Sequence, residues 1–257
     1  MKTNFARNLF FGTVSVMLAV ALFAVAESLT NASIANAKDT KSKGSRAFLD
    51  EKVPDVKNFK LLYSFDPLNV KPSDGVTFTY DVDNSKDIKG KIKRVCYFLR
   101  YKKDGKDQYA AVVMPPLDPD PAKLGVPVTS VDKIYQQTIS KVKIYSNVEG
   151  VETGEFKDGC NVEFWSGNTT KHNVANVPDA GSSYDWGDGP RAGVGYGSMQ
   201  IHNYSKKQCV ISFSNFRGTD HCDVGIGNSP SGHPDWTFSA SAKTFADGQF
   251  LILVELD

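Results

Sequence analysis

The chain has 257 residues, of which 40% are hydrophobic and 23% are charged. Its 30 Lys and Arg residues almost balance its 29 Asp and Glu residues, which leaves a formal net charge of +1 at pH 7. The length fits one large domain better than two. The charge balance excludes the strongly basic surface that would attract nucleic acid or an anionic membrane. We therefore expect no nucleic-acid partner.

The beginning of the chain has the pattern of a secretory signal peptide. A basic start is followed by an almost wholly apolar run over residues 9–26. Small residues allow cleavage after Ala26 or after Ala37, and the second position is favoured. An uncleaved anchor is the alternative, because the run is near the ~18 apolar residues at which a membrane-spanning helix can form. We expect a signal peptide over residues 1–37, a mature chain with no membrane span, and a secreted, periplasmic or cell-surface location.

Two segments that differ in composition and residue pattern follow this leader. Residues 38–57 are polar, basic and poor in pattern, and we expect a flexible linker there. Residues 58–257 show short apolar–polar alternations broken by Gly, Pro, Asn and Asp, which is typical of strands. A single short helix is expected over residues 130–138. The expected strands are 59–65, 75–82, 92–102, 107–114, 140–146, 160–165, 195–204, 207–216, 222–227, 234–239 and 248–256.

Two tight turns support this reading of the domain. Asp104-Gly105 joins two runs of strand-favouring residues and predicts a hairpin, because both residue types tolerate positive φ. A second hairpin is expected at residues 204–207. The many short strands and Gly-rich connections predict an all-β fold. The chain has no repeat of fixed period, which argues against a propeller or a solenoid. The expected architecture is a two-sheet, jelly-roll-like β-sandwich with long loops and at most one or two short helices.

Four cysteines, Cys96, Cys160, Cys209 and Cys222, would enter a compartment that permits oxidation if the chain is exported. Three pairings are possible. The near pair Cys209 and Cys222 is preferred, because its short loop gives about 3 kcal/mol in the chain-entropy model. Buried free thiols are the alternative. None of the four lies in a Cys-x-x-Cys pair, so neither a zinc ribbon nor a thioredoxin-type redox site is indicated.

Aromatic, Asn, Asp, His and Gly residues are concentrated between residues 158 and 236. Aromatic rings stack on the apolar faces of sugars, while Asn, Asp and His hydrogen-bond their hydroxyl groups. For each Trp the alternative is that the ring fills the core. The candidate ligand-binding residues are Trp165, Asn168, Tyr184, Asp185, Trp186, Asp188, His202, Asn203, His221 and Trp236.

Carboxylates in the same segment are candidates for a metal site. Asp179, Asp185 and Asp188 lie in one expected loop, and hard cations such as Ca²⁺ take clusters of carboxylate oxygens. The EF-hand pattern is missing. The alternative to a metal site is that these acidic side chains are solvated on a loop. No other cofactor is indicated.

Sequence motifs for hydrolysis are missing. The chain has no Gly-x-Ser-x-Gly elbow, no Gly-Asp-Ser turn and no His-Glu-x-x-His pair. Ser198 with His202 is the least implausible nucleophile and base. On one strand, however, an offset of four residues separates them by roughly 13 Å. We expect no catalytic residue.

Five ordered phrases carry a family resemblance, namely Gly159–Trp165, Tyr184–Asp188, Gly195–Asn203, Val224–Asn228 and Pro234–Phe238. They resemble an accessory β domain associated with bacterial sialate O-acetylesterases, and the similarity covers roughly residues 60–256. Those esterases act through a Ser-His-Asp arrangement on a Gly-Asp-Ser type α/β domain, which this chain lacks. The resemblance therefore implies the accessory β-sandwich standing without the catalytic domain.

Three functions fit these observations. The leading hypothesis is a secreted, non-catalytic domain that binds a glycan or cell-surface polysaccharide, or otherwise serves the cell envelope, through residues 158–236. The second is a carbohydrate O-acetylesterase that uses Ser198, either His202 or His221, and an Asp. The third is a self-associating structural protein of an extracellular layer.

Overall fold

The computed structural model describes residues 38–71, 78–126, 135–165, 198–215, 220, 222–228 and 245–257. The chain divides into two compact units, Met1–Lys43 and Gly44–Asp257. In the first unit the described residues, 38–43, are helical. Both sheets belong to the second unit. Within the described residues, no helix is long and apolar enough to cross a membrane.

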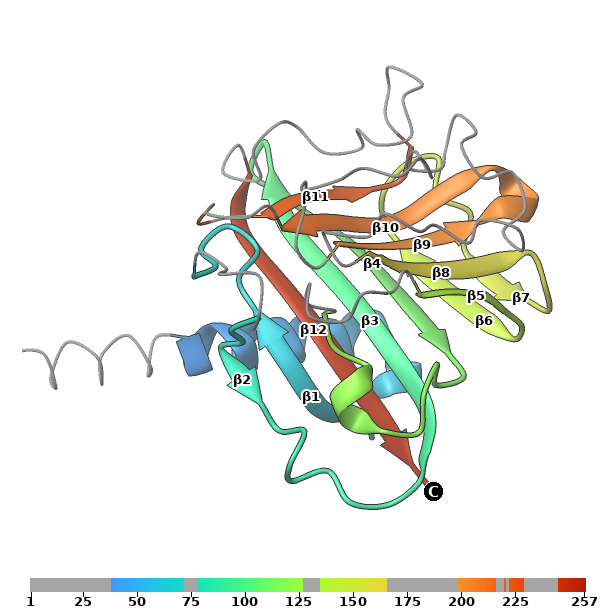
Figure 1. Cartoon of the computed structure of the whole chain (residues 1–257). Helices are drawn as coiled ribbons and strands as arrows, with labels where there is room; N and C mark the ends of the chain where they lie inside the picture. The colour runs from blue at the N-terminus through green and yellow to red at the C-terminus, as the bar shows by residue number, and fades with distance from the viewer. Residues whose placement is uncertain are drawn as a thin grey trace, which may run out of the picture. The chain divides into compact units, whose positions relative to one another are not determined.

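The second unit contains two antiparallel sheets that face each other (Figure 1). The larger has the order β2-β1-β12-β3-β4-β6-β7 and the smaller the order β11-β10-β9-β8-β5. The larger sheet consists of β1 (Lys60–Phe65), β2 (Val82–Asp83), β3 (Ile92–Lys103), β4 (Lys106–Met114), β6 (Val142–Ser146), β7 (Gly154–Phe156) and β12 (Ala246–Leu256). The smaller consists of β5 (Tyr135–Ile139), β8 (Cys160–Trp165), β9 (Ser198–Asn203), β10 (Gln208–Asn215) and β11 (Cys222–Ile226). This arrangement confirms the predicted all-β, two-sheet sandwich.

The core between the sheets is held by aromatic contacts. Phe65 of β1 stacks on Phe250 of β12 with ring centroids 5.0 Å apart. Phe213 of β10, in the other sheet, meets Phe65 at 5.6 Å and Phe250 at 5.0 Å, edge to face in both cases. All three rings are fully buried. Burial of such rings, with geometry that favours the contact, is a main source of stability for the sandwich.

The two central strands of the larger sheet are buried on both faces. Burial is continuous over Val95–Leu99 in β3 and over Gly248–Val254 in β12. Alternate residues of a strand point to opposite faces, so a continuous buried run needs a cover on each side. The smaller sheet covers one face. The other face packs against the N-terminal segment, which we define as residues 44–59.

The N-terminal segment overturns the prediction of a flexible linker over residues 38–57. Residues 38–52 are helical, and Pro54–Val56 form a 3₁₀ turn. Leu49, Val53 and Val56 have no exposed surface, and they pack in one cluster with residues of β3, β4 and β12. Their spacing of four and three residues is that of one helix face. Many charged residues surround these three positions, so the short apolar pattern was not recognised in the sequence.

Hydrogen bonds from Arg46 connect the helix to the turn that follows it. Its guanidinium donates to the carbonyl oxygens of Phe59 at 2.7 Å, Val56 at 2.9 Å and Lys57 at 3.0 Å. It also pairs with Asp50 one turn further along the helix. One side chain thereby satisfies three backbone acceptors at the point where the segment enters β1.

Both predicted hairpins are confirmed, and so are most of the strands. Asp104 and Gly105 take φ values of 51° and 75° at the β3–β4 turn, and Lys207 takes 54° at the β9–β10 turn. The helix expected over residues 130–138 is wrong where the chain is described, because residues 135–139 form β5 and pair with β8. In the described part of the strand expected over 75–82, residues 78–82, only Val82 is in a strand. The strand expected over 234–239 lies outside the described residues.

The predicted Cys209–Cys222 disulfide is absent, and all four cysteines are buried free thiols. In the β10–β11 ladder Cys222 lies opposite Asn215, six residues along β10 from Cys209. That offset corresponds to about 20 Å along a strand, whereas bridged cysteines have Cα atoms less than about 7 Å apart. Closeness in sequence was misleading, because the hairpin places the two residues at opposite ends of the pair.

Free thiols give the first prediction. The native protein should not react with a thiol reagent, and in denaturant all four cysteines should react. A reductant should leave the melting temperature unchanged. Two reactive thiols in denaturant together with a lower melting temperature under reducing conditions would instead show a disulfide.

The packing of the N-terminal segment gives the second prediction. Leu49→Ala should lower the free energy of unfolding by about 2–5 kcal/mol, because the side chain is fully buried against the larger sheet. Glu51→Ala, on the exposed side of the same helix, should change it by less than about 0.5 kcal/mol. Equal effects in a urea titration would contradict the assigned packing.

Candidate functional site

Few of the predicted site residues fall within the described structure. Trp165 ends β8, and His202 and Asn203 end β9. The remaining ligand and metal candidates lie outside the described residues, namely Asn168, Asp179, Tyr184, Asp185, Trp186, Asp188, His221 and Trp236. Within the part of the chain that is described, no group of three or more His, Cys, Asp or Glu side chains could hold a metal ion.

His202 is enclosed in a row of polar side chains on the smaller sheet. It is 1% exposed, and its neighbour Asn203 is fully buried. Its Nδ1 lies 3.0 Å from the amide oxygen of Asn161, its partner across β8, and its Nε2 lies 2.9 Å from that of Gln200. Asn203 accepts a hydrogen bond from the Ser205 hydroxyl at 2.7 Å. Neither His202 nor Asn203 presents its side chain at the surface, where a glycan would need it.

The same row continues across the sheet. Ser212 lies opposite Gln200 on β10 and is 1% exposed, and Asp223 of β11 is 4% exposed. Residues opposite one another in a ladder share a face, so these side chains lie on the face away from Met199 and Ile201. The core-facing side of this sheet is apolar, and its other side is buried and polar.

The environment of His202 rules it out as a base for Ser198. Burial lowers the pKa of His202 to about 3. The ring is therefore neutral at physiological pH, and its single N–H can donate to only one of the two amide oxygens. Both ring nitrogens face these neighbouring amides rather than Ser198, which lies four residues away on the same strand, roughly 13 Å along it. This pair cannot form a catalytic dyad.

The buried imidazole gives the third prediction. Its pKa is about 6.5 unfolded and about 3 folded, so the unfolded chain binds the extra proton between these values. The stabilising contribution is complete above pH 6.5 and is lost as the pH falls, at about 1.4 kcal/mol per pH unit. His202→Gln should show a flatter fall in unfolding free energy between pH 6.5 and pH 4. Carboxylates contribute equally to both proteins, so an identical slope in the variant would contradict the assignment.

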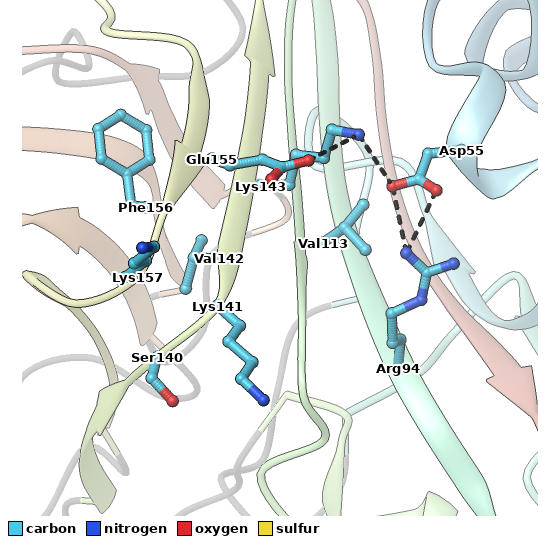
Figure 2. A pocket seen from close by; sticks show the side chains of 10 residues that line it. All are labelled: Asp55, Arg94, Val113, Ser140, Lys141, Val142, Lys143, Glu155, Phe156 and Lys157. Carbon is cyan, nitrogen blue, oxygen red and sulfur yellow. Dashed lines mark hydrogen bonds and ion pairs between the residues drawn. The ribbon is translucent and has the colours of Figure 1, made fainter.

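A cleft of about 780 Å³ opens at one end of the larger sheet (Figure 2). Arg94 near the start of β3 and Val113 near the end of β4 form one side, and the turn before β6 together with β7 forms the other. Ten residues line it: Asp55, Arg94, Val113, Ser140, Lys141, Val142, Lys143, Glu155, Phe156 and Lys157. We call this the β6–β7 cleft.

A network of ion pairs crosses the cleft. Asp55, from the N-terminal segment, lies 3.2 Å from Arg94 and 3.7 Å from Lys143. Lys143 also lies 3.4 Å from Glu155, its partner across the β6–β7 ladder. Arg94 donates to Glu255 as well, and this bond lowers the pKa of the Glu255 carboxyl. The two carboxylates that line the cleft are therefore both paired.

Two further cations line the cleft, Lys141 in the turn before β6 and Lys157 directly after β7. Lys141 has a φ of 60°, in the left-handed region, where the chain passes from β5 of one sheet into β6 of the other. Its backbone N–H donates to the carbonyl of Lys157 at 3.2 Å, which extends the β6–β7 ladder by one position. Both side chains are exposed, and neither has an acidic partner among the described residues.

Sequence reasoning did not find this cleft. Its lining comes from the N-terminal segment and from four strands that are distant along the chain. Lys141 and Lys157 look like ordinary solvated lysines, and Asp55 falls in the stretch predicted to be a linker. Only the sheet order β3-β4-β6-β7 brings them together.

Comparison of the chain with models of protein families, with curated proteins and with solved structures found no match. The resemblance to an accessory domain of sialate O-acetylesterases thus stays an expectation from five sequence phrases.

Proposed function

We propose that the protein is an exported, non-catalytic β-sandwich domain that binds carbohydrate of the cell envelope in the β6–β7 cleft. The observation that carries this proposal is the cleft itself, whose volume of about 780 Å³ is within the roughly 300–1,000 Å³ of small-ligand sites. Its residues are borne mainly on strands and their turns, which hold binding groups more precisely than long loops do.

The chemistry of the lining suits a sugar. Saccharide hydroxyl groups both donate and accept hydrogen bonds, and the cleft offers the Ser140 hydroxyl, ammonium donors and the carboxylates of Asp55 and Glu155. Phe156, which is partly exposed, adds apolar surface for the carbon face of a ring. Positively and negatively charged side chains held by the strands can distinguish the positions of the hydroxyl groups of a sugar.

Export agrees with the state of the cysteines. Burial raises the pKa of Cys160 to about 12 and also raises the pKa of Cys96 and Cys222. The reactive thiolate is therefore scarce at neutral pH, and enclosed thiols of this kind are inert. Free cysteines can thus persist in an oxidising compartment, and the apolar run before residue 27 supplies the leader.

A binding role is favoured over the esterase alternative. His202 is neutral and enclosed, and each of its ring nitrogens faces an amide oxygen, so it has no capacity to activate Ser198. No other observation in the described residues favours hydrolysis. A structural role in an extracellular layer would show itself as self-association without any saccharide.

The fourth prediction tests the proposed site by blocking it. The purified chain, expressed with its own leader, should bind saccharides on a glycan array. Ser140→Trp places a large ring at the exposed turn that lines the cleft, and it should weaken binding at least about tenfold. The control is Lys103→Trp at the other end of β3, nine residues or about 30 Å from Arg94.

Three outcomes separate the possibilities. Loss of binding in Ser140→Trp alone supports the cleft. Binding that both variants retain rejects the cleft as the site. A folded chain that binds no glycan and forms oligomers rejects carbohydrate binding in favour of a structural role.

A further inference from the structure

We infer that the β6–β7 cleft takes an anionic saccharide, one that carries carboxylate or sulfate groups, and that Lys141 and Lys157 contact the anion. This inference rests on the proposed carbohydrate function and names the ligand class for the same site.

The charge balance of the cleft favours a negative ligand. Of the ten lining residues, Arg94, Lys141, Lys143 and Lys157 are cationic, whereas only Asp55 and Glu155 are anionic. Both carboxylates are already engaged by Arg94 and Lys143. Two positive charges are left over, and they belong to Lys141 and Lys157. An anionic ligand would pair with these two exposed ammonium groups, whereas a neutral sugar would leave them to water.

The backbone holds the two lysines next to each other. Val142 lies opposite Phe156 in the β6–β7 ladder, and the hydrogen bond from Lys141 N–H to the Lys157 carbonyl places these two residues opposite as well. Like charges on opposite positions of a ladder destabilise it. An anion bound between them would remove that repulsion, so ligand binding should stabilise the fold as well as fill the cleft.

The direction of Lys141 places its charge over the cleft. The residue has a φ of 60°, and its side chain extends from the turn toward the side of the cleft that carries Arg94 (Figure 2). An anionic group there would accept charge-assisted hydrogen bonds from an exposed ammonium on a flexible side chain. The neighbouring Ser140 hydroxyl remains for a sugar hydroxyl.

The chain contains a matched control for this pair. Lys103 and Lys106 also lie opposite each other at the end of a hairpin, and both are exposed. They flank the Asp104-Gly105 turn at the far end of β3 and β4, and neither lines the β6–β7 cleft. The two pairs therefore share residue type, exposure and repulsion, and they differ in the presence of the cleft.

The fifth prediction uses isothermal titration calorimetry on the full chain. The probes are a galacturonate oligomer, a sulfated galactan oligomer, a neutral galactan oligomer of the same length, and polyglutamate of the same charge. The proteins are the wild type, the double variant Lys141→Gln with Lys157→Gln, and the control double variant Lys103→Gln with Lys106→Gln. Melting curves check that each variant is folded.

At least one anionic oligomer should bind the wild type more tightly than the neutral oligomer and should raise its melting temperature. The cleft double variant should weaken this binding about tenfold, as expected for two solvent-exposed charge contacts, and the control should leave it unchanged. Added salt should weaken binding by the wild type more than by the cleft variant. Comparison of the two anionic probes identifies carboxylate or sulfate as the recognised group.

Four results would count against the inference or against the function on which it rests. Equal affinity for the neutral oligomer, unchanged in the cleft variant, overturns the anionic ligand and leaves carbohydrate binding intact. Polyglutamate binding as tight as that of the sugars, lost in the cleft variant, keeps the anion contacts and overturns carbohydrate recognition. Equal losses in both double variants show an unspecific charge effect, and no binding of either anionic oligomer overturns the inference outright.

Discussion

The seven-stranded sheet is apolar on both faces at its centre, and this constraint determines the rest of the architecture. Continuous burial over Val95–Leu99 and Gly248–Val254 requires two covers. The smaller sheet supplies one, through contacts such as those of Phe213 with Phe65 and Phe250. The N-terminal segment supplies the other. A two-layer sandwich of the usual kind would leave Cys96, Phe98, Leu251 and Leu253 exposed to water.

The second cover also builds part of the candidate site. The turn that ends the N-terminal segment places Asp55 against Arg94 and Lys143, at the edge of the apolar patch that the helix covers. The segment thus contributes to packing and to the cleft through residues only six positions apart, Leu49 and Asp55. Loss of the N-terminal segment would expose the sheet, and it would also remove the carboxylate that Arg94 and Lys143 share.

The sequence predicted local features well and distant ones poorly. Alternation and turn chemistry located the strands and both hairpins, because these signals lie within about ten residues of one another, as at Asp104-Gly105. The N-terminal segment was missed, because its buried residues Leu49, Val53 and Val56 are spaced among many charges. The Cys209–Cys222 pairing failed for a related reason: distance along the chain says little about distance across a ladder. The cleft depends on sheet order, which no local pattern encodes.

The candidate ligand residues also show how little local composition says about burial. His202 and Asn203 belong to a phrase rich in polar groups, which indicated a surface that recognises sugars. The structure instead encloses His202 between Asn161 and Gln200. Polar composition could not separate a binding surface from a buried hydrogen-bonded row, because both need the same residue types. Burial decides between them, and burial depends on packing that the sequence does not display.

The strength of binding expected at the β6–β7 cleft bears on what kind of ligand it serves. Arg94 and Lys143 are held by Asp55 and Glu155, so a ligand meets mainly the exposed ammonium groups of Lys141 and Lys157. Exposed charge pairs contribute about 0–1 kcal/mol each and weaken with salt. One such site would bind a single sugar weakly. A polymer with many repeated anionic units offers one cleft several neighbouring sites, so the effective concentration of the anion near the cleft exceeds that of a free sugar. The modest charge of the cleft therefore fits a polysaccharide better than a free monosaccharide.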